Sequence, residues 1–293
     1  MNINDLKNRL QQLNRRTSKA NDIWKPKDEH DIRLLPYKHG DDPLIERYFH
    51  YEIGDNQTIL CPKMNFGDDC AVCEFCDKLK AWKDPEGNDK PERTRKEDWE
   101  LFKKIQPKVR VFVPMVERTK EADGAKFWGI TPNQAQALLE ICSEGDRLGA
   151  LGINPDDAKN ALNVIFGIDK AFDLHISFAK PGEKGNTKTF GQVTIKGKIM
   201  PTAILADKKA AAALLDGMKK MDEVYPKMSS EEVSRIFAKF CGEGTAEAKP
   251  EGGVEKYEEK AEKPAAPNTK EDAKKVGGRS IDEAFGDMLG EDN

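Results

Sequence analysis

Hydrophobic and polar residues alternate along several stretches of the chain, and this alternation predicts β-strands with one buried face. Pro36 ends the first stretch, and the turn signal Gly54-Asp55-Asn56 follows the second, so a hairpin is expected there. The predicted strands are residues 32–35, 44–53, 58–60, 108–117, 125–130, 172–179 and 189–195.

Other segments carry apolar residues at helical spacing and are predicted to be helices. They are residues 3–14, 75–83, 202–221 and 229–240. A further helix is expected to begin at Thr131, because threonine is a suitable N-cap and Pro132 suits the first helical position. Residues 84–98 are polar and loop-like, so no element is predicted there.

The composition changes this picture at the ends of the chain. The 293 residues are enough for a sizeable core, but 34% of them are charged and only 38% are hydrophobic. Such an average is typical of a folded core with disordered ends. From about residue 242 alanine, lysine, glutamate, proline and glycine dominate, which predicts a disordered linker. We therefore expect an N-terminal arm (1–20), a folded core (21–241), and a linker with a tail (242–293).

Charge is distributed unevenly between those ends. The formal net charge is −4, which alone argues against a nucleic-acid partner. However, residues 1–20 carry five basic side chains and one acidic side chain, whereas residues 281–293 carry five acidic side chains and no basic one. Opposite charge at opposite ends indicates arms that bind a partner or each other.

Membrane and secretion signals are not found in the sequence. It contains no run of about 18 apolar residues and no apolar stretch typical of a signal peptide near its start. A cytosolic location is therefore expected, with its six cysteines reduced and the clustered ones acting as metal ligands. A phosphate-binding loop of the G-x-x-x-x-G-K-[ST] type is also missing, so ATP use is not expected.

The strongest motif is the cluster Cys61-x8-Cys70-x2-Cys73-x2-Cys76. Tetrahedral zinc takes four such ligands, and the closely spaced pair Cys70 and Cys73, with Cys61 as a third, fits one ion. The fourth ligand is either His50 or Cys76. The predicted hairpin brings His50 beside Cys61, whereas three ligands around one helix start would crowd each other, which favours His50. Four protein ligands predict one structural zinc ion.

Basic and aromatic residues recur together after the cysteines. Single strands are bound without sequence preference by positive grooves and aromatic faces, so these residues are candidate DNA contacts. The candidates are Lys103, Lys104, Lys108, Arg110, Phe112, Lys126, Phe127, Trp128, Lys180, Lys188 and Phe190.

In this order, the motifs resemble the single-stranded DNA-binding, helix-destabilising proteins of tailed phages of the T-even type. The basic run Arg15-Arg16-Thr17-Ser18 is similar to the family's cooperativity motif. His50 with the three cysteines looks like its zinc subdomain. KKIQPKVRVFVP followed by GAKFWGI is similar to its basic and aromatic strands, and the acidic end to its tail. Cys76 and the short tail depart from the family pattern.

The resemblance implies an α+β fold: an OB-fold-like β-barrel core with an inserted zinc subdomain at about residues 48–83, peripheral helices and a disordered acidic tail. It implies cooperative, sequence-independent binding of single-stranded DNA in phage replication, recombination and repair, in the cytoplasm of the infected bacterial host, without enzymatic activity. The arm would mediate self-association along DNA. The tail would contact replication and recombination proteins through Asp282, Glu283, Phe285, Asp287, Met288 and Leu289.

Two other functions remain as alternatives. A zinc deaminase carries H-x-E and P-C-x-x-C motifs, and His50-Tyr51-Glu52 with Cys70-x2-Cys73 matches them in outline. Asp69 in place of the proline, and Cys61 at the position that must stay open for water, argue against it. A zinc-ribbon scaffold that binds only proteins is the other alternative.

Overall fold

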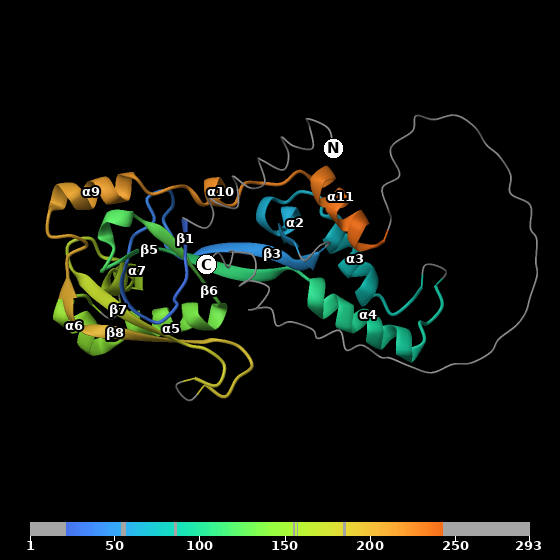
Figure 1. The fold of residues 1–293 in the computed structure, drawn as a ribbon, viewed down its shortest axis with the longest axis horizontal. Coiled ribbons are helices and arrows are strands. Elements are labelled where there is room, and N and C mark those ends of the chain that lie inside the picture. Colours follow the sequence, from blue (N-terminus) through green and yellow to red (C-terminus); the bar gives the residue numbers. More distant parts are fainter. Residues whose placement is uncertain are drawn as a thin grey trace, which may run out of the picture.

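The computed structural model describes residues 22–53, 57–84, 87–154, 156, 158–183 and 186–242. These residues form a mixed α+β fold with two parts placed side by side (Figure 1). One part is a β-sheet covered by helices. The other is a small helical module at the far end of strands that extend from that sheet. The α+β class is therefore confirmed.

The described strands form one open, largely antiparallel sheet of eight strands. Its main order is β1-β6-β5-β2-β7-β8, and β3 pairs with both β5 and β4. Only β1 and β6 are parallel among the pairs of this sheet in the described residues. The strands are β1 (Ile23–Trp24), β2 (Glu29–Leu34), β3 (Ile45–Ile53), β4 (Gln57–Leu60), β5 (Lys108–Glu117), β6 (Lys126–Ile130), β7 (Ala171–Ala179) and β8 (Gln192–Thr202).

Strand β5 connects the two parts. Its first half pairs with β3 from Lys108 to Phe112, and its last residues pair with β2 from Met115 to Glu117. Both partners lie on one edge of β5, and β6 lies on the other. The β3–β5 ribbon therefore carries the chain from the sheet into the helical module, and we call this ribbon the waist (Figure 1).

Helices surround the sheet and build the module. The module contains α2 (Pro62–Phe66), α3 (Ala71–Lys80), α4 (Glu92–Ile105) and α11 (Ser230–Phe240). The remaining helices are α5 (Pro132–Cys142), α6 (Gly145–Leu151), α7 (Ala158–Ala161), α8 (Asn163–Phe166), α9 (Lys208–Asp216), α10 (Met221–Val224) and the 3-10 turn η1 (Glu121–Asp123). Within the described residues, no helix combines the length and the apolar character needed to cross a membrane.

Local sequence signals account for several element boundaries. Thr131 caps α5 as predicted: its side chain accepts from the backbone N–H of Gln134, and the Gln134 side chain accepts from the N–H of Thr131. Helix α4 was not predicted. It begins directly after Pro91 within a polar stretch, and apolar residues become frequent only in its second half.

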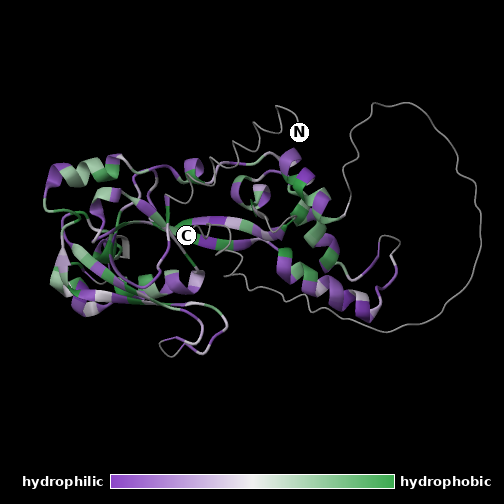
Figure 2. Cartoon of the chain, viewed as in Figure 1, coloured by the Kyte–Doolittle hydropathy of each residue, from purple (hydrophilic) through white to green (hydrophobic). Residues whose placement is uncertain are grey.

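Three apolar clusters stabilise the described fold. The first lies between the sheet and helices α5, α6 and α8, around Trp128 and Leu174. The second is covered by α9 and α10 and contains Phe49 and Phe112. The third fills the module between α3, α4 and α11. The apolar faces of these elements turn inward, whereas much of the outer face of α4 is polar (Figure 2).

A buried ion-pair network ties the sheet together. Arg33 is fully buried, and its guanidinium donates to Asp173 and to the backbone oxygens of Gly167 and Ala171. Arg118 forms a two-pronged pair with the same carboxylate, at 2.8 and 3.0 Å. The Asp173 carboxylate therefore compensates the charges of two guanidinium groups, and that of Arg33 has no contact with water.

Candidate metal centre and nucleic-acid surface

The candidate metal ligands come from three neighbouring elements. His50 lies on β3, and the β3–β4 hairpin pairs it with Ile59. Cys61 follows β4 and is the N-cap of α2, where its sulfur accepts from the N–H of Met64. Cys70 is the N-cap of α3, and Cys73 lies in its first turn. The hairpin expected from the turn signal thus brings His50 and Cys61 to one place.

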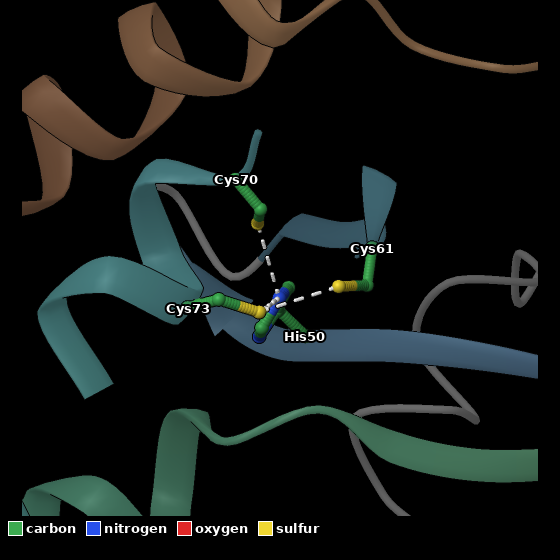
Figure 3. A group of neighbouring side chains, drawn as sticks. All are labelled: His50, Cys61, Cys70 and Cys73. Atoms are coloured by element: carbon green, nitrogen blue, oxygen red, sulfur yellow. Dashed lines mark hydrogen bonds between the residues drawn. The ribbon is translucent and has the colours of Figure 1, made fainter. Parts of the chain in front are cut away.

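The four side chains converge on a common centre (Figure 3). Their ligand atoms all lie within 4.8 Å of one another, and all four residues are buried. Nε2 of His50 is 3.4 Å from Sγ of Cys70 and 3.5 Å from Sγ of Cys73, and the sulfurs of Cys61 and Cys73 are 3.4 Å apart. Zinc bond lengths imply ligand separations of roughly 3.5–3.8 Å in a tetrahedron. The cluster could therefore hold a metal ion such as zinc.

A hydrogen bond fixes the orientation of the histidine ring. Nδ1 of His50 donates to the carbonyl oxygen of Ile105, the last residue of α4, at 2.8 Å. This contact leaves Nε2 deprotonated and directed at the sulfurs in the neutral ring, which is the usual arrangement around a metal-bound imidazole. Helix α4 therefore helps to define the metal centre even though it supplies no ligand.

The close contacts among these four side chains shift the pKa values of several of them. Burial disfavours a charged imidazole, but hydrogen bonds to Cys61 and Cys70 raise the pKa of His50 to about 9. Hydrogen bonds with Cys61 and Cys73 lower the pKa of Cys70. Hydrogen bonds with Cys61 and Cys70, together with burial, raise the pKa of Cys73. A divalent cation would replace the shared protons and compensate the thiolates, as metal binding at such sites requires.

Cys76 lies outside this cluster, so His50 is the fourth member of the group. Cys76 is buried on α3, and burial raises its pKa to about 11, which keeps it a neutral thiol. With His50 and three cysteines the tetrahedral set is complete. A metal there has no position left for the water that a zinc deaminase must activate.

Several candidate DNA contacts are placed in the core instead. Phe112, Phe127 and Trp128 are at most 2% exposed and belong to the two apolar clusters of the sheet. A ring packed on both faces cannot stack on a base, so the expectation for these three residues is wrong in this conformation. Strand β5 is buried on both faces from Arg110 to Glu117, and Phe127 and Trp128 are adjacent residues of β6 that point to its two faces.

The basic candidates are distributed over four places. Lys103 and Lys104 are exposed on α4 and pair with Glu100 and Glu52. Lys126 pairs with Asp123 beside the sheet. At the waist, Lys108 is half-buried and Arg110 is buried.

The fourth place is the hairpin between β7 and β8. Lys180, Lys188 and Phe190 are all exposed there, and the Lys188 ammonium lies 5.4 Å from the centre of the Phe190 ring. Asn186 organises the loop by donating to the carbonyl oxygens of Ala179 and Phe190. Of the predicted aromatic contacts, Phe190 is therefore the exposed one.

An aromatic surface on the module adds Trp82 and Trp99 to the candidate contacts. Trp82 is 72% exposed and Trp99 is 51% exposed, which is unusual for such large apolar side chains. The Arg95 guanidinium lies 5.3 Å from the Trp82 ring, and Trp99 stacks on Phe102 at 5.2 Å. Arg95, Trp99 and Phe102 follow the helical spacing i, i+4, i+7, a signal that was available in the sequence once residues 92–105 are taken as helical.

The predicted arm and tail lie outside the described residues. This holds for Arg15, Arg16, Thr17 and Ser18, and for the tail residues Asp282, Glu283, Phe285, Asp287, Met288 and Leu289. Their predicted roles stay predictions. A comparison of the chain with protein-family models finds no match, and neither does a comparison with curated proteins.

Proposed function

We propose that this protein binds single-stranded DNA without sequence preference, through two exposed projections that combine aromatic and basic side chains. The observation that carries the proposal is the pair of exposed tryptophans on the module together with the basic hairpin β7–β8. Helix α4 and this hairpin extend toward the same side of the molecule (Figure 1). A single strand that crossed the waist would meet both.

The module projection offers stacking faces next to cations. Trp82 is paired with Arg95, and Lys80 lies 4.5 Å from the centre of the Phe102 ring, which Trp99 covers. Stacking of a base on an aromatic ring contributes about 1–3 kcal/mol and tolerates any base, because every base has a π-face. This chemistry supports binding without sequence preference.

The hairpin projection offers the same combination on a smaller scale. Lys180 and Lys188 provide phosphate contacts, and Phe190 provides a stacking face. When lysines bind phosphates, they release counterions that were condensed on the DNA. The affinity for DNA should therefore fall as the salt concentration rises.

We further propose that the metal is one structural zinc ion. It would hold α2, α3 and the β3–β4 hairpin together and so position Trp82 and Lys80 at the end of α3. The OB-fold-like character of the curved sheet, the cooperative role of residues 1–20, the partner-binding role of the tail and a phage replication setting all rest on the family resemblance and belong to the same proposal.

Tryptophan fluorescence tests the stacking surface directly. Trp24 and Trp128 are buried against each other, so oligonucleotide quenching reports on Trp82 and Trp99. We expect oligo(dT) to quench the emission of the wild-type protein. Trp82→Ala and Trp99→Ala should each remove part of the quenching and weaken binding about 5- to 150-fold, which corresponds to the loss of one stacking contact.

Leu139→Ala is the matched control, because Leu139 is another exposed apolar side chain, lies on α5 and belongs to neither projection. Its affinity for oligo(dT) should equal that of the wild type. Wild-type affinity in both tryptophan variants would contradict a stacking role for the module surface.

A further inference from the structure

Cationic side chains gather on one face of the waist. In the β3–β5 register Arg47 lies directly opposite Arg110, and Phe49 lies opposite Lys108. Directly opposite residues of antiparallel strands point to the same face of a sheet, and so do residues two apart on one strand. Arg47, Arg110 and Lys108 therefore share a face, interleaved with Phe49 and Phe112.

Like charges directly opposite each other destabilise a strand pair unless an anion compensates them. Here a carboxylate on α10 takes that role: Arg47 donates to Asp222 at 2.7 Å. The Arg47 guanidinium also donates to the carbonyl oxygen of Glu46, and its Nε is buried without a hydrogen-bond partner among the described residues. Arg47 thus retains donor capacity that its present partners do not use.

Asp222 belongs to a segment that covers this face. Tyr225, just after α10, packs on Phe49 and Phe112 with ring centres 5.1 Å apart in each pair. The segment is held at its start by the Tyr37 hydroxyl, which accepts from the N–H of Met221. The Asp222 side chain itself is 65% exposed, so a solvent-borne anion can reach the position that its carboxylate occupies.

We propose that Arg47, which lies opposite the buried Arg110, forms a phosphate-binding subsite for the DNA backbone at the waist, and that Asp222 occupies this subsite when DNA is not bound. Binding exchanges one anion for another: a phosphodiester oxygen accepts from the Arg47 guanidinium, and the Asp222 carboxylate turns into solvent. Planar guanidinium groups bind carboxylate and phosphate oxygens in the same geometry, which makes the exchange possible. The inference rests on the proposed function and adds Arg47 and Asp222 to the residues that carry it.

Charge-neutralising variants of two matched carboxylates test this subsite. Asp222→Asn removes the carboxylate that pairs with Arg47. Asp216→Asn removes an equally exposed carboxylate, which lies at the end of α9 and pairs with Lys38. Both variants change the net charge equally, so their difference isolates the local contact. We expect Asp222→Asn to raise the affinity for oligo(dT) about two- to fivefold above that of Asp216→Asn at low salt, the range for one exposed ion pair. Equal affinities of the two variants would overturn the proposal.

Arg47→Ala should weaken binding and reduce the slope of log affinity against log salt by about 0.7, which is the value for one phosphate contact on a single strand. An unchanged slope would also overturn the proposal. Inorganic phosphate, compared with chloride at equal ionic strength, separates this result from a failure of the proposed function. If the wild type binds no oligonucleotide, single-stranded DNA binding is wrong. The arginine subsite then stands only if phosphate raises the melting temperature of Asp222→Asn, and it falls if phosphate does not.

Discussion

Replacement of Cys70 by serine is expected to remove the metal and to lower the melting temperature by about 10 °C or more. Metal binding at structural sites is worth about 10–16 kcal/mol in isolated zinc-binding peptides, and this free energy is part of the folding free energy. Losing even about 3 kcal/mol of this free energy lowers the melting temperature of a chain of this size by about 10 °C. Metal analysis of the purified protein and thermal unfolding, with and without a chelator, measure both effects.

Two cysteines outside the cluster provide the controls. Cys241 is exposed at the end of α11, so Cys241→Ser should keep both the metal and the melting temperature. Cys76→Ala should keep the metal and lose stability only through its small buried volume. His50→Ala should release the metal. A wild-type protein that purifies without metal and is insensitive to chelator would show that the cluster is only a set of buried thiols and an imidazole.

Removal of the Asp173 carboxylate is expected to cost about 3–5 kcal/mol of unfolding free energy. The variant Asp173→Ala leaves the guanidinium of Arg33 buried without its counter-ion, and breaking one side of a buried pair has this cost. Burial already disfavours the charged form of Arg33: desolvation lowers its pKa to about 10, even though Asp173 opposes the shift. Urea unfolding of the variant and the wild type measures the difference.

A solvent-exposed ion pair provides the control, because removing one of its carboxylates should cost little unfolding free energy. Arg93 and Glu97 pair one turn apart on α4, with side chains that are 90% and 64% exposed. Glu97→Ala should therefore change the unfolding free energy by about 0.5 kcal/mol or less. A similar small loss in Asp173→Ala would mean that the network around Asp173 does not stabilise the sheet.

The cluster of His50 and three cysteines was predictable because the residues that form it are close in the sequence. The spacing of Cys61, Cys70 and Cys73 identifies the ligands, and the turn signal at 54–56 implies the hairpin that brings His50 to them. The core of the module was less accessible, since Phe102, Ile105 and Val233 complete it from distant parts of the chain. Sequence spacing gives no direct access to that packing.

For the proposed nucleic-acid surface, the sequence indicates which residue types are present but not which of them are exposed. The residue pattern of β5 and β6 identifies strands, yet it does not show that both of their faces are covered, and Phe112, Phe127 and Trp128 proved to be buried. Conversely, the exposed Trp82 follows the end of α3 and lies beside Arg95 of α4, a helix whose polar first half resembles a loop. Exposure is a tertiary property, and therefore only the fold distinguishes a stacking surface from a core.

The most direct test of the proposed function compares single-stranded and duplex DNA of the same length by fluorescence anisotropy at several salt concentrations. Three to five phosphate contacts predict a slope of log affinity against log salt of roughly −2 to −3.5 on the single strand, at about −0.7 per contact. We expect the single strand to bind at least about tenfold more tightly than the duplex, because only its bases are free to stack on Trp82, Trp99 and Phe190. Equal affinity for the two forms at every salt concentration would contradict the proposal.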